Sequence, residues 1–192
     1  GKGLSEFFTP NTLEVKEIWR DITKHVETKE SRIRAAHKWV GSQIKYRPFV
    51  SGTLTIAGKT SRQDDLWMQP SMTRRVGVGN CANKAFLLTS LLRNELGSNE
   101  VHCVLGNLHN GKVGGHAWVE ARLDRSYIIE STRGDVETFV PAAIASRYEA
   151  VHYFNDQESF VIEGRTILEP FQDFYSTWLA DYLDWAYIQG RK

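Results

Sequence analysis

The spacing of apolar residues predicts two helices near the start of the chain. Segments 12–28 and 31–46 carry apolar residues at steps of three and four, which is typical of a helix with one buried face. These positions include Val15, Ile18, Trp19, Ile33 and Trp39. Pro48 should end the second helix, because the residue before a proline avoids helical backbone angles.

A third helix is predicted after Asn80, at the centre of the chain. Asn80 suits the N-cap position, and Gly97 supplies a stop signal. The apolar positions between them are Ala85, Leu88, Leu91, Leu92 and Leu96. Their helical spacing indicates that this helix is buried on one side.

The second half of the chain favours strands. The expected strands lie at 101–105, 114–121, 127–130, 149–154 and 159–163, the last two forming a hairpin around Asn155-Asp156. Segment 140–147 resembles a short helix, whereas 47–79 has no regular period and is interpreted as an irregular wall of a cleft. The pattern therefore predicts an α+β fold in which the central helix packs on an antiparallel sheet.

The C-terminal segment 170–188 is dense in aromatic residues at helical spacing. They are Phe171, Phe174, Tyr175, Trp178, Tyr182 and Trp185. We expect an amphipathic helix that docks on the core. The alternative is a contact surface for a partner or a second copy, since Trp and Tyr are favoured there. The segment has too many acids and too few lysines for a helix lying on a membrane.

Length and charge narrow the class of protein. The 192 residues allow one sizeable core, so we expect a single domain over 1–192 with its core at about 30–165. Lys and Arg number 24 against 23 Asp and Glu, which gives no basic field for nucleic acid. No apolar stretch is long enough to cross a membrane and no signal peptide is visible, so a cytoplasmic location is favoured.

Candidate chemistry begins with Cys81, which follows a glycine-rich loop and opens the central helix. A thiolate in the first turn of a helix is stabilised by the macrodipole and by amides without intrahelical acceptors. His116 opens a predicted strand, and Glu130 lies at the end of the next strand. A cysteine nucleophile needs a base and a group that orients the base. The order Cys81, His116, Glu130 on helix, strand and strand fits those three roles.

The pattern Gly-Asn-Cys before a helix, with Gly-His-Ala-Trp-Val-Glu on a strand and an acid closing the hairpin, resembles the transglutaminase-like, papain-related superfamily of cysteine enzymes. The resemblance covers roughly residues 30 to 132. It implies a papain-like core and an acyl-enzyme mechanism on peptide or protein amides. Members near this pattern often read Gly-Asp-Cys-Glu-Asp and use Asp as the third group, whereas this chain has Asn80, Ala82 and Glu130.

An acyl-transfer site also needs donors for the developing oxyanion. The Cys81 amide is one candidate. The resemblance suggests the Trp67 indole as a second, Gln69 is the papain-style alternative, and Asn80 and Trp118 are further cleft candidates. Trp67 could equally be a packing residue under its loop.

The length of the turn before Glu130 decides which face of the sheet it occupies. A two-residue turn would pair Glu130 with Val119, on the face opposite His116. A three-residue loop or a bulge would pair it with Trp118, a diagonal neighbour of His116. We predict the odd loop. On the other register, Asp135 or a backbone carbonyl would have to orient His116.

Metal and cofactor chemistry is not expected. The spacings of His102, Cys103, His109 and His116 fit no usual structural zinc site. Cys81 and Cys103 are expected to be two unbridged thiols, since a disulfide would consume the nucleophile. The other histidines, which are His25, His37 and His152, should be surface or partly buried residues.

The sequence thus predicts cysteine-dependent acyl transfer on amide bonds. Hydrolysis by a peptidase or amidase is favoured, because the chain shows no calcium site or large accessory domains such as animal cross-linking relatives carry. This preference for hydrolysis is based on a comparison with those relatives. The alternatives are a transglutaminase that accepts an amine and a non-catalytic binding module on the same fold.

Overall fold

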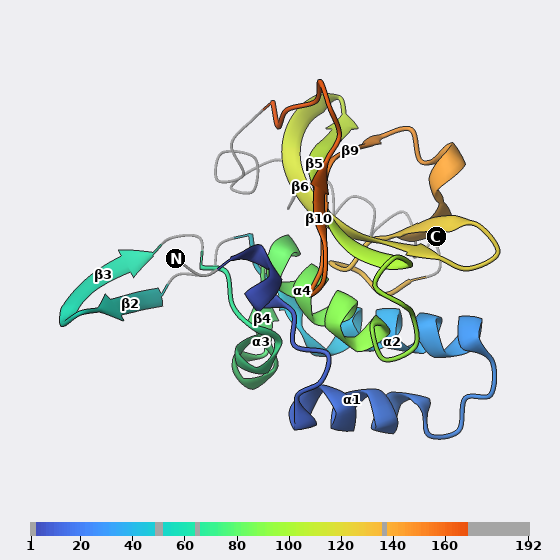
Figure 1. Ribbon diagram of the computed structural model, residues 1–192, viewed down its shortest axis with the longest axis horizontal. Coiled ribbons are helices and arrows are strands. Elements are labelled where there is room, and N and C mark those ends of the chain that lie inside the picture. The colour runs from blue at the N-terminus through green and yellow to red at the C-terminus, as the bar shows by residue number, and fades with distance from the viewer. Residues whose placement is uncertain (1–2, 49–51, 64–65, 136–137, 169–192) are drawn as a thin grey trace.

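The computed structural model describes residues 3–48, 52–63, 66–135 and 138–168, and combines helices with an antiparallel sheet (Figure 1). The helices are η1 (Leu4–Phe7), α1 (Leu13–Thr23), α2 (Lys29–Gln43), α3 (Pro70–Val76), α4 (Cys81–Leu92) and η3 (Ala142–Ile144), where η marks a 3-10 helix. The strands are β1 (Lys45–Tyr46), β2 (Gly52–Ile56), β3 (Lys59–Gln63), β4 (Val78–Gly79), β5 (Val101–Asn110), β6 (Lys112–Arg122), β7 (Ser126–Ile129), β8 (Phe139–Pro141), β9 (Tyr148–Phe154) and β10 (Ser159–Val161). The predicted α+β class is confirmed.

The main sheet has six strands in the order β10-β9-β5-β6-β7-β8, and each neighbouring pair is antiparallel. β5 and β6 are long strands joined by a tight turn at Gly111, where the positive φ of 77° favours glycine. The predicted hairpin of β9 and β10 is present. The helix predicted at 140–147 is present only as the single turn η3. The residues before it, 139–141, form strand β8 and pair with β7.

α4 is buried along its whole length, which corrects the prediction of a single buried face. It lies between the sheet and the N-terminal helices, in contact with β5 and β6 and with α1, α2 and α3 (Figure 1). Its polar residues Asn83, Lys84, Thr89 and Ser90 have almost no exposed surface, like its apolar ones. A helix enclosed by two layers has no solvent face, so its polar side chains need partners inside the protein.

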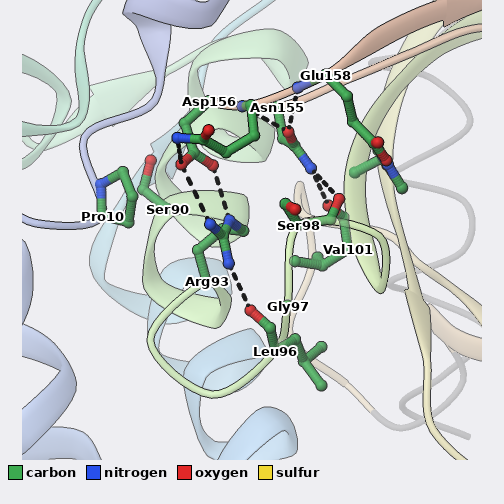
Figure 2. A network of polar contacts seen from close by, with 12 residues as sticks. Pro10, Ser90, Arg93, Leu96, Gly97, Ser98, Val101, Asn155, Asp156 and Glu158 are labelled. Atoms are coloured by element: carbon green, nitrogen blue, oxygen red, sulfur yellow. Dashed lines mark hydrogen bonds and ion pairs between the residues drawn. The ribbon is translucent and has the colours of Figure 1, made fainter.

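The end of α4 also differs from the prediction, since the helix stops at Leu92 and not at Gly97. The Arg93 guanidinium binds both carboxylate oxygens of Asp156 and donates to the Leu96 carbonyl, while Asn155 donates to Ser98 and Val101 (Figure 2). This network ties the end of α4 to the loop between β9 and β10.

The two predicted N-terminal helices are present as α1 and α2. The hydroxyls of Thr12 and Thr28 accept hydrogen bonds from the backbone amides of Val15 and Ser31, which caps each helix. α2 ends at Gln43, before Pro48, because the chain extends there into β1 and pairs with β4.

Segment 47–79 is more regular than expected, which corrects the prediction of an irregular wall. It contains the β2–β3 hairpin, which projects from the body of the molecule, and then α3 and β4 (Figure 1). Pro70 occupies the first turn of α3, and Gly77 ends that helix with a φ of 73°. The predicted aromatic helix at 170–188 lies outside the described residues. No helix in the described part of the chain is long and apolar enough to span a membrane.

Candidate active site

Cys81 is the first residue of α4, as predicted. Asn80 is the N-cap, and its Oδ1 atom accepts a hydrogen bond of 2.9 Å from the Asn83 amide. The Cys81 amide therefore lies in the first turn, where helical geometry offers no acceptor within the helix. Cys81 has no exposed surface. The sequence signal of a capped cysteine before an apolar helix placed this residue correctly.

His116 and Glu130 meet in the sheet beside α4. The loop between β6 and β7 consists of residues 123–125, because Arg122 pairs with Ser126. The predicted three-residue loop is confirmed, and its register, continued one residue past the pair of Val119 and Ile129, puts Glu130 opposite Trp118. His116 Nε2 and Glu130 Oε2 lie 2.7 Å apart, with His116 fully buried and Glu130 3% exposed. Glu130, and not Asp135, binds the His116 ring.

The Glu130 carboxylate has two more side-chain partners, which the sequence analysis missed. The Tyr148 hydroxyl donates to Oε2 at 2.9 Å, and the Thr132 hydroxyl donates to Oε1 at 2.9 Å. Burial alone would raise the pKa of Glu130, but the charge of His116 and these hydrogen bonds outweigh it and hold the pKa below its ordinary value. The carboxylate therefore stays ionised beside the imidazole.

The loop after Glu130 is held by α2. His37 Nε2 lies 2.9 Å from the Glu130 carbonyl oxygen and 3.2 Å from the Thr138 hydroxyl. Gly41 packs so closely on Gly134 that a Cβ atom there would lie 2.2 Å from the Gly134 nitrogen. His37 is 2% exposed, so the prediction of a surface or partly buried histidine is wrong. Burial lowers the pKa of His37, against the opposing effect of its hydrogen bonds to this loop.

Lys84, on α4, is a further residue that the sequence analysis overlooked. It lies three residues after Cys81 and is fully buried. Its Nζ atom donates to the Ile44 carbonyl at 2.5 Å and to the Thr132 carbonyl at 3.2 Å. The sequence signal was weak, because Lys84 is one of several polar residues in this mostly apolar helix.

The cleft candidates lie in different surroundings. Trp118 is fully buried, its ring packs edge-on against Tyr148 with centroids 5.0 Å apart, and it covers Gly106. Its indole nitrogen has no hydrogen-bond partner among the described residues. Its distance from His116, 6.0 Å between ring centroids, places it beside the imidazole.

Trp67 and Gln69 are held by other parts of the protein. Trp67 packs edge-on against Phe86 and Phe7, with ring centroids 5.3 and 5.7 Å apart. Asn83 fixes the backbone on both sides of it by accepting from the Met68 amide and donating to the Leu66 carbonyl. The Gln69 carboxamide donates to the Glu6 carbonyl at 2.9 Å. Packing thus accounts for the position of Trp67, and a role for either residue as an oxyanion donor stays a prediction.

The second thiol has a different environment. Cys103 lies in β5, has no exposed surface and is not bridged to Cys81. Burial in this apolar setting raises its pKa well above the ordinary thiol value, which makes it a poor nucleophile. Among the described residues, no group of three or more His, Cys, Asp or Glu side chains is arranged to hold a metal ion.

An open cavity of about 430 Å³ lies against the loop that follows Glu130. It is lined by Lys38, Gly41, Ser42, Thr132, Arg133, Gly134 and Asp135. Cys81 and His116 do not line it, and both are fully buried. This cavity is therefore separate from the surroundings of the Cys81 thiol.

A helix that presents a cysteine at its first residue, packed on an antiparallel sheet that carries a histidine–carboxylate pair, defines the papain-like class of α+β folds. Residues 16–130, more than half of the chain, match the transglutaminase-like superfamily model. The chain belongs to the transglutaminase-like superfamily.

Solved structures support the same fold. LapG from Legionella pneumophila is similar over 94% of this chain and 91% of its own, with 17% identity and a TM-score of 0.57. Its calcium-bound form is similar over 90% of this chain and 93% of its own, with 15% identity and a TM-score of 0.56. At this identity the likeness shows the fold alone. No curated protein sequence matches the chain.

Proposed function

We propose that the chain is a cysteine-dependent acyl-transfer enzyme that hydrolyses amide bonds in peptides or proteins, with Cys81, His116 and Glu130 as its catalytic residues. The observation that carries the proposal is the buried 2.7 Å contact between His116 Nε2 and Glu130 Oε2, on a strand that packs against the helix opened by Cys81. An ionised carboxylate on one ring nitrogen fixes the tautomer of a histidine and stabilises its protonated form.

The proposed reaction begins with attack of the Cys81 sulfur on an amide carbonyl carbon. The thiol proton passes to His116 Nδ1, because Nε2 is engaged by Glu130. The protonated His116 then gives this proton to the leaving amine, and a thioester remains on Cys81. Water attacks the thioester, His116 takes up its proton, and the carboxylic acid leaves as the thiol is restored.

Two features support a nucleophilic Cys81. The first turn of α4 provides the positive end of the helix dipole, which favours a thiolate. In the proposed reaction, the Cys81 amide in the same turn is the candidate donor to the oxyanion that develops on the bound carbonyl. Water as the second acceptor gives hydrolysis, whereas an amine would give a cross-link at the same thioester.

The proposal is tested by the pH dependence of Cys81 alkylation with iodoacetamide, followed by peptide mass mapping. The wild type is compared with His116→Ala, and Cys103 serves as the internal control. We expect the midpoint of Cys81 alkylation to lie near or below about pH 7 and to move toward the free-thiol value of about 8.5 in the variant. A wild-type midpoint near that of an ordinary thiol, unchanged by His116→Ala, would leave the binding-module alternative in its place.

A further inference from the structure

Lys84 is a fully buried lysine that the proposed reaction does not use directly. Removing an ammonium group from water is costly unless other groups compensate it, so such a residue calls for a reason. Its Nζ atom donates to two backbone carbonyls from different parts of the chain, Ile44 at the end of α2 and Thr132 in the loop after β7. One side chain on α4 therefore joins three segments that surround the candidate site.

The contact with Thr132 continues to the catalytic histidine. The Thr132 hydroxyl donates to Glu130 Oε1 at 2.9 Å, and Glu130 Oε2 lies 2.7 Å from His116 Nε2. These contacts run from Lys84 to His116 without passing through Cys81. The helix that carries the nucleophile is thus connected to the carboxylate that orients the base.

Both hydrogen bonds of Lys84 survive its deprotonation. Burial lowers the pKa of Lys84 to about 7, against the opposing attraction of the Glu130 carboxylate. A neutral amine keeps two N–H groups, which is the number needed for the Ile44 and Thr132 carbonyls. The connection therefore has the same donors above and below neutral pH.

We propose that Lys84 is a positioning residue for the acyl-transfer reaction: by holding the Thr132 carbonyl against α4, it sets the Thr132 hydroxyl and places Glu130 where it orients His116. This inference rests on the proposed function above. Lys84 does not touch the reacting atoms in this role. It fixes the separation between the helix of Cys81 and the loop of Glu130, which come from opposite sides of the site.

A purely structural role makes a different prediction. If Lys84 only stabilises the fold, its replacement lowers the melting temperature and leaves the Cys81 thiolate unchanged. If Lys84 acts through Thr132 and Glu130, its replacement weakens the hold on the imidazolium, and the Cys81 alkylation midpoint rises. The midpoint of the pH profile is therefore the informative readout.

The experiment compares Lys84→Met, Thr132→Val and the double variant in the alkylation assay, together with their melting temperatures. Methionine keeps the length of the side chain without its donors, and valine removes only the Thr132 hydroxyl. We expect each single variant to raise the midpoint by about one pH unit. The double variant should shift it no further than the larger single shift, because both changes break the same series of contacts.

Arg93→Met is the matched control. It removes a cation that binds Asp156 (Figure 2). Arg93 is the C-cap of α4, at the opposite end of the helix from Cys81. We expect it to lower the melting temperature and to leave the alkylation midpoint where it is in the wild type.

The outcomes separate the two proposals. A wild-type midpoint that depends on His116 but not on Lys84 overturns this inference and keeps the proposed function. Additive shifts in the double variant also overturn it, because they show that Lys84 acts by another route. If Lys84→Met does not fold, Thr132→Val still tests this inference, and an unchanged alkylation midpoint in that variant is enough to overturn it. A wild-type midpoint of an ordinary thiol removes both proposals.

Discussion

The His116 imidazole and the Glu130 carboxylate share a hydrogen bond of 2.7 Å in a setting that water hardly reaches. In such surroundings the attraction between a carboxylate and an imidazolium is stronger than at the surface. The hydroxyls of Tyr148 and Thr132 also donate hydrogen bonds to the Glu130 carboxylate. Both carboxylate oxygens therefore have hydrogen-bond partners although the side chain is buried. In the proposed reaction, this pair would stabilise the proton that His116 accepts from Cys81.

Replacing Glu130 by glutamine should raise the midpoint of Cys81 alkylation by about one pH unit or more. Glutamine keeps the shape of the side chain but removes the charge that stabilises the imidazolium. The control is Glu158→Gln, which alters a second histidine–glutamate pair, with His102, near the start of β5 and four residues before the partner of His116 in the sheet. An equal shift in both variants would contradict a specific role for Glu130.

Glu130 should also make the fold sensitive to acid. Its pKa is below the ordinary 4.5 in the folded protein, so the unfolded chain binds the proton first as the pH falls. The stabilisation by Glu130 is present above the unfolded value and is lost as the pH falls through the folded one.

Urea unfolding checks this acid effect. At pH 7 we expect Glu130→Gln to lower the free energy of unfolding by about 1–3 kcal/mol. The difference from the wild type should shrink at pH 4 and below. A difference that stays constant over this range would show that the charge of Glu130 does not stabilise the fold.

Lys84 should make the free energy of unfolding depend on pH in the alkaline range. Its pKa falls from 10.5 to about 7 on folding, so between these values the unfolded chain carries more protons than the folded one. The free energy of unfolding should therefore rise with pH, by about 1 kcal/mol per pH unit between pH 8 and 9.5. Lys84→Met should lack this rise. Equal slopes for the two proteins in urea titrations would contradict the burial of Lys84.

Gly41→Ala should destabilise the fold although Gly41 lies within α2. Alanine is the better helix former by about 1 kcal/mol. Its Cβ atom would nevertheless lie 2.2 Å from the Gly134 nitrogen and displace the loop that follows Glu130. We expect a net loss of about 1–3 kcal/mol in urea unfolding. Gly3→Ala, where the nearest atom would be 3.9 Å away, should be close to neutral.

Local signals carried the predictions that the structure confirms. The cap at Asn80 and the position of Cys81 depend on neighbouring residues, since Asn80 binds the amide of Asn83. The face of Glu130 depends on the length of one turn, and the three-residue loop was predicted because it places Glu130 on the face of His116. Such features involve short separations along the chain, where propensity and pattern are informative.

The missed features depend on distant segments. Lys84 meets Thr132, and His37 meets the Glu130 carbonyl 93 residues further along the chain. No sequence pattern around either residue indicates that it has a buried partner. The full burial of α4 was missed for the same reason, because the layers on its two sides come from different halves of the chain. The hairpin at 52–63 carries too few apolar residues for its pattern to indicate strands.

The complete burial of Cys81 also affects how fast its thiol is oxidised. Oxidation to sulfenic acid follows thiolate character and exposure, and Cys81 has no exposed surface. Peroxide and other electrophiles in solution meet the sulfur only in the fraction of molecules that have opened locally. A ligand that binds the open form increases that fraction. In the proposed role of Cys81, its burial would therefore protect the thiol from oxidation until a substrate binds the open form.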